Sequence, residues 1–286
     1  MTVEVRRAAD RMATRTDWLD SRHSFSYGLH YDPANTHFGL LLAANEDVLA
    51  PGAGFAEHPH RDVEVVTWVL SGALAHADSA GHRGEARPGV VQRMSAGAGI
   101  RHTERAGGDG PAHYVQVWVR PGHPGGDPTY DTLDVSSALE TGTVVTLTPL
   151  RQPDATLHAV RLPAGAAADL PAAPWLHVFA ARSAITLDVS GPGTARSATI
   201  GPGAAVSGGA VSGGAVSGGA VSSRAVPGAA GWYGAGRGAA GPGGTAAVRL
   251  DKGDAARLTG EGAVTVTAIA DAEVLAWEMR AGRVVG

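Results

Sequence analysis

Two short stretches of the chain place metal-binding side-chain types two residues apart. The first holds His58 and His60, and the second holds His102 and Glu104. Side chains alternate along a β-strand, so each pair would leave the backbone on one side of its strand. Three imidazoles and a carboxylate, with no thiolate, suit a first-row metal such as iron, nickel, copper, manganese or zinc. The spacing therefore predicts a site for one metal ion with these four residues as ligands.

Other acidic residues compete with Glu104 for the fourth position. Glu57, Glu64 and Asp62 lie close to the first pair, and the last two share the strand parity of His60. Because both side chains would point to the same side of a strand as His60, Glu64 and Asp62 remain possible metal ligands. Glu64 fits better as a partner that holds the ring N–H of a ligand.

An open metal site of this kind can carry out chemistry. Four protein ligands on an octahedral ion leave two positions for water, dioxygen or a bidentate organic substrate. Glu104 could either ligate the ion or accept a proton from the substrate, so we also predict it as the catalytic residue. His76 and His113 lie in or beside expected strands and could line the cavity.

Short β-rich runs separated by glycine and proline turns surround both pairs. Such runs, with almost no helical period, predict an all-β sandwich or barrel. The expected strands of the first half are 38–43, 63–70, 90–94 and 114–120. Those of the second half are 144–147, 158–162, 176–179, 184–189, 246–250, 262–268 and 273–279.

A low-complexity segment interrupts the second half. Residues 205–219 are three copies of Ala-Val-Ser-Gly-Gly, and glycine-rich sequence continues to Gly244. This composition buries too little apolar surface to offset the ordering of glycine. We expect a flexible loop over about 191–244 inside a second domain at 131–286, which follows a first domain at 1–130.

The composition excludes several classes of protein. The formal net charge of −4 gives no sign of a basic nucleic-acid groove. The absence of cysteine rules out disulfides and thiolate metal sites. The N-terminal residues lack an apolar signal region, and no apolar run reaches the length of a membrane span. We expect a cytoplasmic monomer that binds neither nucleic acid nor membranes.

The residues around both pairs resemble those of the pirin family. The match runs through 58–72 and 94–104, and extends upstream to 18–26, 31–33 and 45–48. It resembles the short bacterial branch described as quercetin 2,3-dioxygenase-like. The second half matches only in β character and in Glu273–Met279.

This resemblance implies two jelly-roll cupin barrels face to face, with a single metal in the first. The family ligands correspond to His58, His60, His102 and Glu104, and the usual ion is Fe(II), although Ni, Mn, Cu or Zn can occupy such sites. The second barrel has no His-x-His pair, so we expect it to be free of metal.

Two activities follow from the resemblance. One is a dioxygenase, or quercetinase, that cleaves a quercetin-like flavonol or related enediol with dioxygen. The other is a non-catalytic, metal-dependent regulator that binds a transcription factor or a metabolic enzyme. The oxidoreductase is the hypothesis we carry forward, with the regulator as its alternative.

Overall fold

The computed structural model describes residues 1–147, 151–190 and 247–280. Within these ranges the regular structure is nearly all β, which confirms the predicted fold class. Two short helical turns accompany the strands: η1 (Ala8–Asp10) and α1 (Ser136–Leu139). No helix in the described ranges is long and apolar enough to cross a membrane. The predicted loop at 191–244 lies outside the described residues.

Two sheets form the first barrel, and the four-stranded one contains both predicted ligand pairs. A seven-stranded sheet has the order β12-β9-β6-β11-β4-β3-β2, and a four-stranded sheet has the order β5-β10-β7-β8. The strands of the first are β2 (Met12–Arg15), β3 (Leu19–His23), β4 (Leu41–Leu49), β6 (Glu64–Ser71), β9 (Val90–Ser95), β11 (Ala112–Val119) and β12 (Thr129–Asp134). The strands of the second are β5 (Gly54–His60), β7 (Ala73–Asp78), β8 (Arg83–Ala86) and β10 (Ile100–Gly107).

The other two sheets form the second barrel. A six-stranded sheet has the order β1-β19-β16-β21-β14-β13, and a four-stranded sheet has the order β15-β20-β17-β18. The strands of the first are β1 (Thr2–Arg6), β13 (Val145–Thr146), β14 (Ala155–Leu162), β16 (Trp175–Arg182), β19 (Ala255–Thr259) and β21 (Ala272–Met279). The strands of the second are β15 (Ala167–Leu170), β17 (Ile185–Ser190), β18 (Val248–Leu250) and β20 (Ala263–Ala268).

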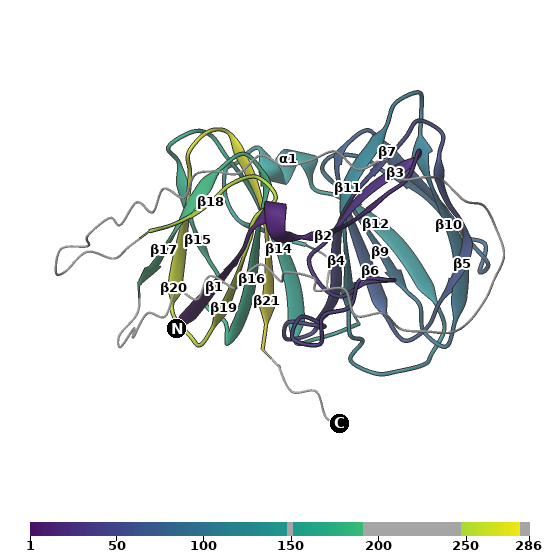
Figure 1. Ribbon diagram of the computed structural model, residues 1–286, viewed down its shortest axis with the longest axis horizontal. Coiled ribbons are helices and arrows are strands. Elements are labelled where there is room, and N and C mark those ends of the chain that lie inside the picture. The colour runs from purple at the N-terminus through teal and green to yellow at the C-terminus, as the bar shows by residue number, and fades with distance from the viewer. Residues whose placement is uncertain (148–150, 191–246, 281–286) are drawn as a thin grey trace, which may run out of the picture. The chain divides into compact units, whose positions relative to one another are not determined.

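The chain contributes one early strand to the later barrel. β1 pairs with β19 in antiparallel register, from Thr2 opposite Thr259 to Arg6 opposite Ala255. In Figure 1 this purple strand lies beside the green and yellow strands of the second barrel. β12, which follows the glycine- and proline-rich stretch at 121–128, pairs with β9 of the first barrel. The domain limits at 130 and 131 remain a prediction.

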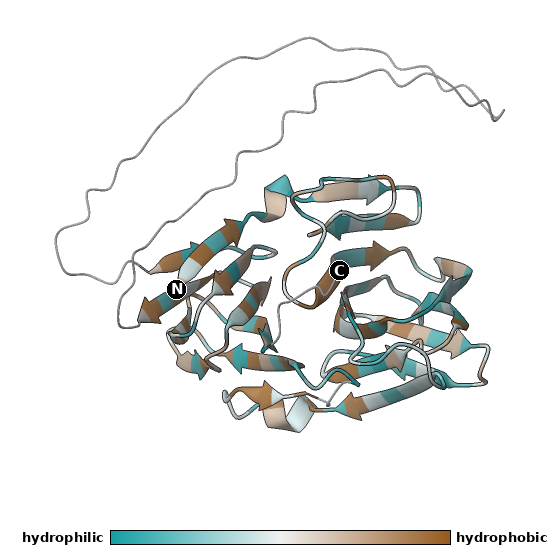
Figure 2. Cartoon of the chain, turned by 90° about the horizontal axis from the view of Figure 1, so that it is seen from below, coloured by the Kyte–Doolittle hydropathy of each residue, from teal (hydrophilic) through white to brown (hydrophobic). Residues whose placement is uncertain are grey.

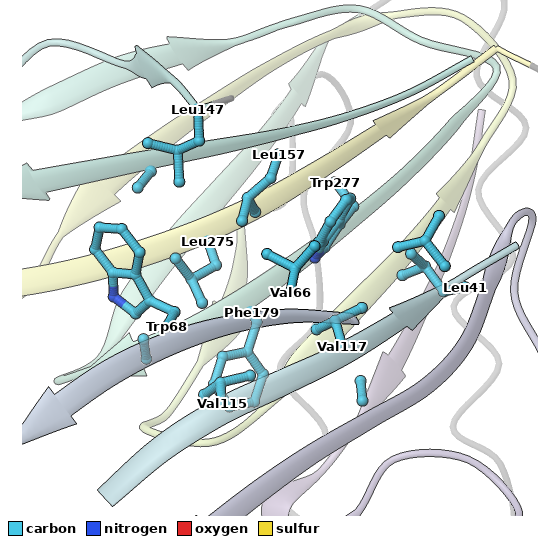
Figure 3. Packing of buried hydrophobic residues seen from close by; sticks show 14 of the residues in the cluster. Leu41, Val66, Trp68, Val115, Val117, Leu147, Leu157, Phe179, Leu275 and Trp277 are labelled. Atoms are coloured by element: carbon cyan, nitrogen blue, oxygen red, sulfur yellow. The ribbon is translucent and has the colours of Figure 1, made fainter. Parts of the chain in front are cut away.

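A shared apolar core joins the seven-stranded and six-stranded sheets. Val66 and Trp68 of β6 and Val115 and Val117 of β11 pack in one cluster with residues of β14, β16 and β21. Figure 3 shows these side chains between the strands of the two sheets. Figure 2 shows brown and teal residues along the strands, the pattern expected of sheets with one apolar face.

One strand missed by the sequence analysis, β3, carries polar residues on its buried face. β3 buries Ser21 and His23 beside Leu19, so its apolar alternation is broken. Ser21 donates to the Asp47 carboxylate and the His23 ring contacts Asn45 at 3.0 Å. Hydrogen bonds with a neighbouring strand satisfy these buried polar side chains, so β3 lacks the apolar alternation by which strands are recognised in a sequence.

Candidate metal centre

Three imidazoles meet on the inner face of the four-stranded sheet. β5 and β10 pair in antiparallel register, which puts His102 directly opposite His58. The ring centroids of His58 and His102 are 4.4 Å apart, and His60 lies 4.9 Å from each. One nitrogen of each ring lies within 4.8 Å of the others, so the three side chains can hold a metal ion.

The predicted carboxylate belongs to a second, adjoining group. The register of β5 against β10 shifts between His102 and Glu104, so Glu104 lies opposite Phe55. On its other side Glu104 lies opposite His76 of β7. Glu104, His76 and His102 form a second group of possible ligands within 4.8 Å, so the two groups share His102.

Hydrogen bonds leave Nε2 of His58 available as a ligand. Nδ1 of His58 lies 2.8 Å from the carbonyl oxygen of Ala56. A carbonyl can only accept, so the proton is on Nδ1 and the Nε2 of the neutral ring carries a lone pair.

Nε2 of His102 is buried and has no hydrogen-bond partner among the described residues. A buried polar atom without a partner costs roughly 1–3 kcal/mol, and a metal ion in the histidine group would satisfy it. These observations show that the residues fit a divalent first-row metal.

His60 and His102 are held in the neutral, metal-binding form. Burial and the neighbouring His58 lower the pKa of His60 to about 4. Burial together with His58, His60 and His76 lowers the pKa of His102 to about 2. A metal ligand must offer a lone pair, so both rings are ready to ligate at neutral pH without first losing a proton.

Glu104 is oriented by an amide from the opposite sheet. Nε2 of Gln116 donates to both carboxylate oxygens of Glu104, at 2.9 and 3.1 Å. Nε1 of Trp118 donates to Oε1 of Gln116 at 3.2 Å, which fixes the amide with its NH₂ group toward Glu104. Burial raises the pKa of Glu104 to about 7, against the lowering effect of the Gln116 hydrogen bond.

A chain of polar side chains extends behind His102. Its Nδ1 lies 3.2 Å from Nδ1 of His76, and Nε2 of His76 lies 3.1 Å from Oδ2 of Asp78. His82, which is partly exposed, places its Nδ1 3.0 Å from the same oxygen. Tyr130 stacks on His76 with ring centroids 4.4 Å apart. Of the cavity residues proposed from sequence, His76 thus lies in the site.

Glu64 and His113 lie away from the histidine group. Ser95 donates to Oε1 of Glu64 at 2.8 Å, on the face of β6 that also carries Val66 and Trp68. Nε2 of His113 lies 2.8 Å from Oε1 of Glu46. The structure therefore does not bring these two side chains to the predicted ligands.

The parity argument for Glu64 fails because β5 ends before β6 begins. Asp62 stands between the strands with a φ of 51°, in the left-handed region, and its carboxylate accepts the N–H of Gly125 at 2.6 Å. The two strands then enter different sheets. Glu57 forms an exposed ion pair with Arg101 at 2.6 Å.

Aromatic rings form two walls beside the histidines. Trp118 meets His60 edge-on at 4.9 Å, and Tyr27 contacts Trp118 at 5.3 Å. Phe55 lies 6.0 Å from His58. A surface groove that includes His60 is also lined by Pro59, Arg61, Ser79, Ala98, Gly99, Ile100 and Arg101. The site is thus bordered by flat apolar surfaces, and His60 also borders this groove.

Sequence reasoning missed Asp78, Gln116 and Trp118. Asp78 follows His76 at the same two-residue spacing as the predicted ligand pairs, so strand parity could have found it. Gln116 and Trp118 also alternate along β11, but a glutamine in a strand gives no signal of the carboxylate that it meets in another sheet.

Comparison with known proteins places the chain among relatives with the same fold. Residues 3–119 match the family model Pirin. The structure of YhhW from Escherichia coli superposes with a TM-score of 0.72 at 23% identity, covering 98% of each chain. A YhhW complex with nickel(II) gives a TM-score of 0.69 and covers 98% of this chain and 99% of its own. These likenesses confirm the predicted pair of cupin barrels.

Curated relatives match more closely in sequence. A protein of Mycobacterium tuberculosis H37Rv, named "Putative quercetin 2,3-dioxygenase", is 49% identical over 201 residues, which cover 66% of this chain and 82% of the relative. The quercetin 2,3-dioxygenase of E. coli K12 is 40% identical over 130 residues, which cover 45% of this chain and 56% of the relative. The chain belongs to the pirin family.

Proposed function

We propose that the first barrel holds one divalent metal ion on His58, His60, His102 and Glu104, and that the protein oxidises quercetin-like flavonols or related enediols with dioxygen. The buried Nε2 of His102 has no hydrogen-bond partner within the described part of the chain and lies beside two further imidazoles, and this is the observation that carries the metal site. The resemblance to pirins favours Fe(II), and the nickel(II) complex of YhhW supports nickel as a second ion to test.

A bound metal of this kind would supply Lewis acidity to a chelating enediol and a redox partner for dioxygen. The protein side chains have separate tasks. Glu104 would accept the proton of a substrate hydroxyl at a carboxylate oxygen, since its pKa of about 7 is near the value that general-base catalysis favours. Gln116 orients that carboxylate, and Trp118 orients Gln116.

The surroundings of the histidines suit a flat aromatic ligand. The rings of Trp118 and Phe55 border His60 and His58 and offer apolar faces to such a molecule while limiting the access of water. The names of the M. tuberculosis and E. coli relatives support a flavonol as the test compound.

Metal binding can be tested by elemental analysis of purified wild type, His102→Ala and His37→Ala. His37 is exposed and contacts Thr36, so its replacement is a matched control for loss of one imidazole. After loading with Fe(II) or Ni(II) and gel filtration, we expect wild type and control to retain close to one ion per chain. We expect His102→Ala to bind at least about ten-fold more weakly. Equal retention by all three proteins would contradict the site.

The reaction can be followed separately through the flavonol absorbance in air. Loaded wild type and His37→Ala should consume quercetin, and Glu104→Gln should be slower by about 10²–10⁴-fold, the usual contribution of a general base. A loaded protein that consumes no quercetin with iron, nickel, manganese, copper or zinc would contradict the oxygenase and favour the regulator.

A further inference from the structure

We infer that Asp78, acting through His76, fixes the tautomer of His102 so that its Nε2 lone pair faces the histidine group. Asp78 and His76 are positioning residues in this scheme. The inference deepens the proposed function, because it concerns how the same site is made ready for its ion.

Asp78 determines which nitrogen of His76 carries the proton. Its Oδ1 accepts the backbone N–H groups of Ala80 and His82, each at 3.0 Å. Its Oδ2 lies 3.1 Å from Nε2 of His76 and 3.0 Å from Nδ1 of His82. The carboxylate has no hydrogen to donate, so Nε2 of His76 must carry the proton in this contact.

The tautomer of His76 then decides which ring donates the hydrogen bond between His76 and His102. A neutral His76 with its proton on Nε2 has a bare Nδ1, which can only accept. The Nδ1 atoms of the two rings are 3.2 Å apart, so Nδ1 of His102 is the donor. A neutral His102 with its proton on Nδ1 has a bare Nε2. This is the buried atom that lacks a partner among the described residues.

These hydrogen-bonded side chains are buried, so each nitrogen atom keeps its protein partner. The side chains of His76 and Asp78 are both fully buried, and His102 is 1% exposed. Water therefore does not compete for these nitrogen atoms, and the stacked ring of Tyr130 covers one face of His76. Metal-bound histidines commonly donate their second N–H to a carboxylate, and here a second imidazole stands between the two.

Asp78→Asn should exchange the donor and acceptor in both contacts, the one between residue 78 and His76 and the one between His76 and His102. The backbone N–H groups of Ala80 and His82 can only donate, so the amide oxygen must stay on their side. The amide NH₂ then faces Nε2 of His76 and donates to it. His76 would carry its proton on Nδ1 and donate to His102, whose own proton would move to Nε2 and block the ligand atom.

The test is long-range ¹H–¹⁵N NMR of the metal-free, full-length protein, which separates the two neutral tautomers of each histidine. His76→Gln and His102→Ala assign the two rings. We expect His102 to carry its proton on Nδ1 in wild type and on Nε2 in Asp78→Asn. Asp20→Asn, which changes an aspartate paired with Arg15 and Arg22, is the matched control and should keep the wild-type tautomer. A wild-type His102 protonated on Nε2, or an unchanged tautomer in Asp78→Asn, would overturn the inference.

Metal titration of the same proteins gives the second readout. Asp78→Asn should bind Fe(II) or Ni(II) at least about ten-fold more weakly than wild type and Asp20→Asn. His76→Gln should bind more tightly than Asp78→Asn, because a glutamine oxygen can still accept the N–H of His102. Equal affinity of these two variants would overturn the role of His76 as the link. If wild type shows the expected tautomer but binds no metal, the proposed function fails while the tautomer assignment stands.

Discussion

Gln116 and Asp78 reach the site from opposite sheets, and each sets the direction of a hydrogen bond to a predicted ligand. Gln116 presents its NH₂ group to Glu104 because Trp118 donates to its carbonyl oxygen. Asp78 accepts from His76 and so directs the contact to His102. Gln116, His76 and the two side chains that they contact are buried, where an unpaired polar atom is costly, so the predicted ligands are oriented before any ion binds.

The buried carboxyl of Glu104 should make the metal-free protein less stable as the pH rises. Its pKa is raised from 4.5 to about 7 by burial. The folded state therefore binds the proton more tightly than the unfolded state between these two values, and stability falls across that window. The penalty is absent below about pH 4.5 and complete above about pH 7, where it amounts to about 3 kcal/mol.

Glu104→Gln removes this penalty. Urea unfolding of metal-free protein should show the variant gaining about 3 kcal/mol over wild type between pH 4.5 and pH 8. Glu261→Gln is the control, because Glu261 is exposed and replacement of an exposed side chain usually changes stability by no more than about 0.5 kcal/mol. A Glu104→Gln difference that is the same at pH 5 and pH 8 would show that the carboxyl does not carry this penalty.

The shared face within each pair of predicted ligands could be inferred from sequence because strand parity is a local property. His58 and His60 share a face whatever the sheet order, and the structure places both beside His102. The partners of Glu104 could not be predicted in this way. Gln116 and Thr67 face each other across β11 and β6, and which strands pair is decided by the whole barrel.

Among the elements, the paired strands β5 and β10 position the three histidines most directly. At Gly54 the backbone of β10 approaches closely: a Cβ atom there would be 2.0 Å from the backbone oxygen of Glu104 and 2.5 Å from Cα of Arg105. No side chain can give way at such a contact. The approach is also next to the register shift that separates His102 from Glu104.

Gly54→Ala should therefore force the two strands apart. We expect a loss of roughly 1–3 kcal/mol in the free energy of unfolding and weaker metal binding, since His58 and His102 face each other across this strand pair. Gly110→Ala is the matched control, because a Cβ there meets no atom within 4 Å. Urea unfolding and metal titration measure both effects, and equal behaviour of the two variants would contradict the close approach.

Strands with long β-branched runs were predicted, whereas a short alternating strand such as β1, with Val3 and Val5 packed on a core, was not. β6 and β11 alternate between the shared core and the barrel interior, and both were expected from their β-branched residues. β12 was not among the expected strands, although it pairs with β9 along its length. Its residues are largely polar and half exposed, as in an edge strand, so periodicity gives little signal.

At the scale of the whole molecule, a buried polar contact joins the two barrels within their shared core. Nε1 of Trp68 in β6 donates to Oε1 of Glu273 in β21 at 2.7 Å. Nε of Arg161 in β14 donates to the other carboxylate oxygen at 2.6 Å. Trp68 is 1% exposed and Glu273 is 0% exposed, so water cannot replace either partner. Unfolding of the first barrel would expose the apolar face of the second and leave Oε1 of Glu273 without the Trp68 donor.

Trp68→Phe tests whether the barrels unfold together. The variant loses the indole N–H, leaves a carboxylate oxygen of Glu273 unpaired and removes ring volume from the core, so we expect a loss of roughly 2–4 kcal/mol. Because the core is shared, urea unfolding of the metal-free protein should remain one transition by far-ultraviolet circular dichroism and by tryptophan fluorescence, with an unchanged m-value.

Trp175→Phe is the control: Trp175 packs on Phe38 at the edge of the same core and is only partly buried, so its replacement should cost less. Two separate transitions in Trp68→Phe, with only the first shifted, would contradict the coupling, because a contact confined to one barrel would leave the stability of the other unchanged.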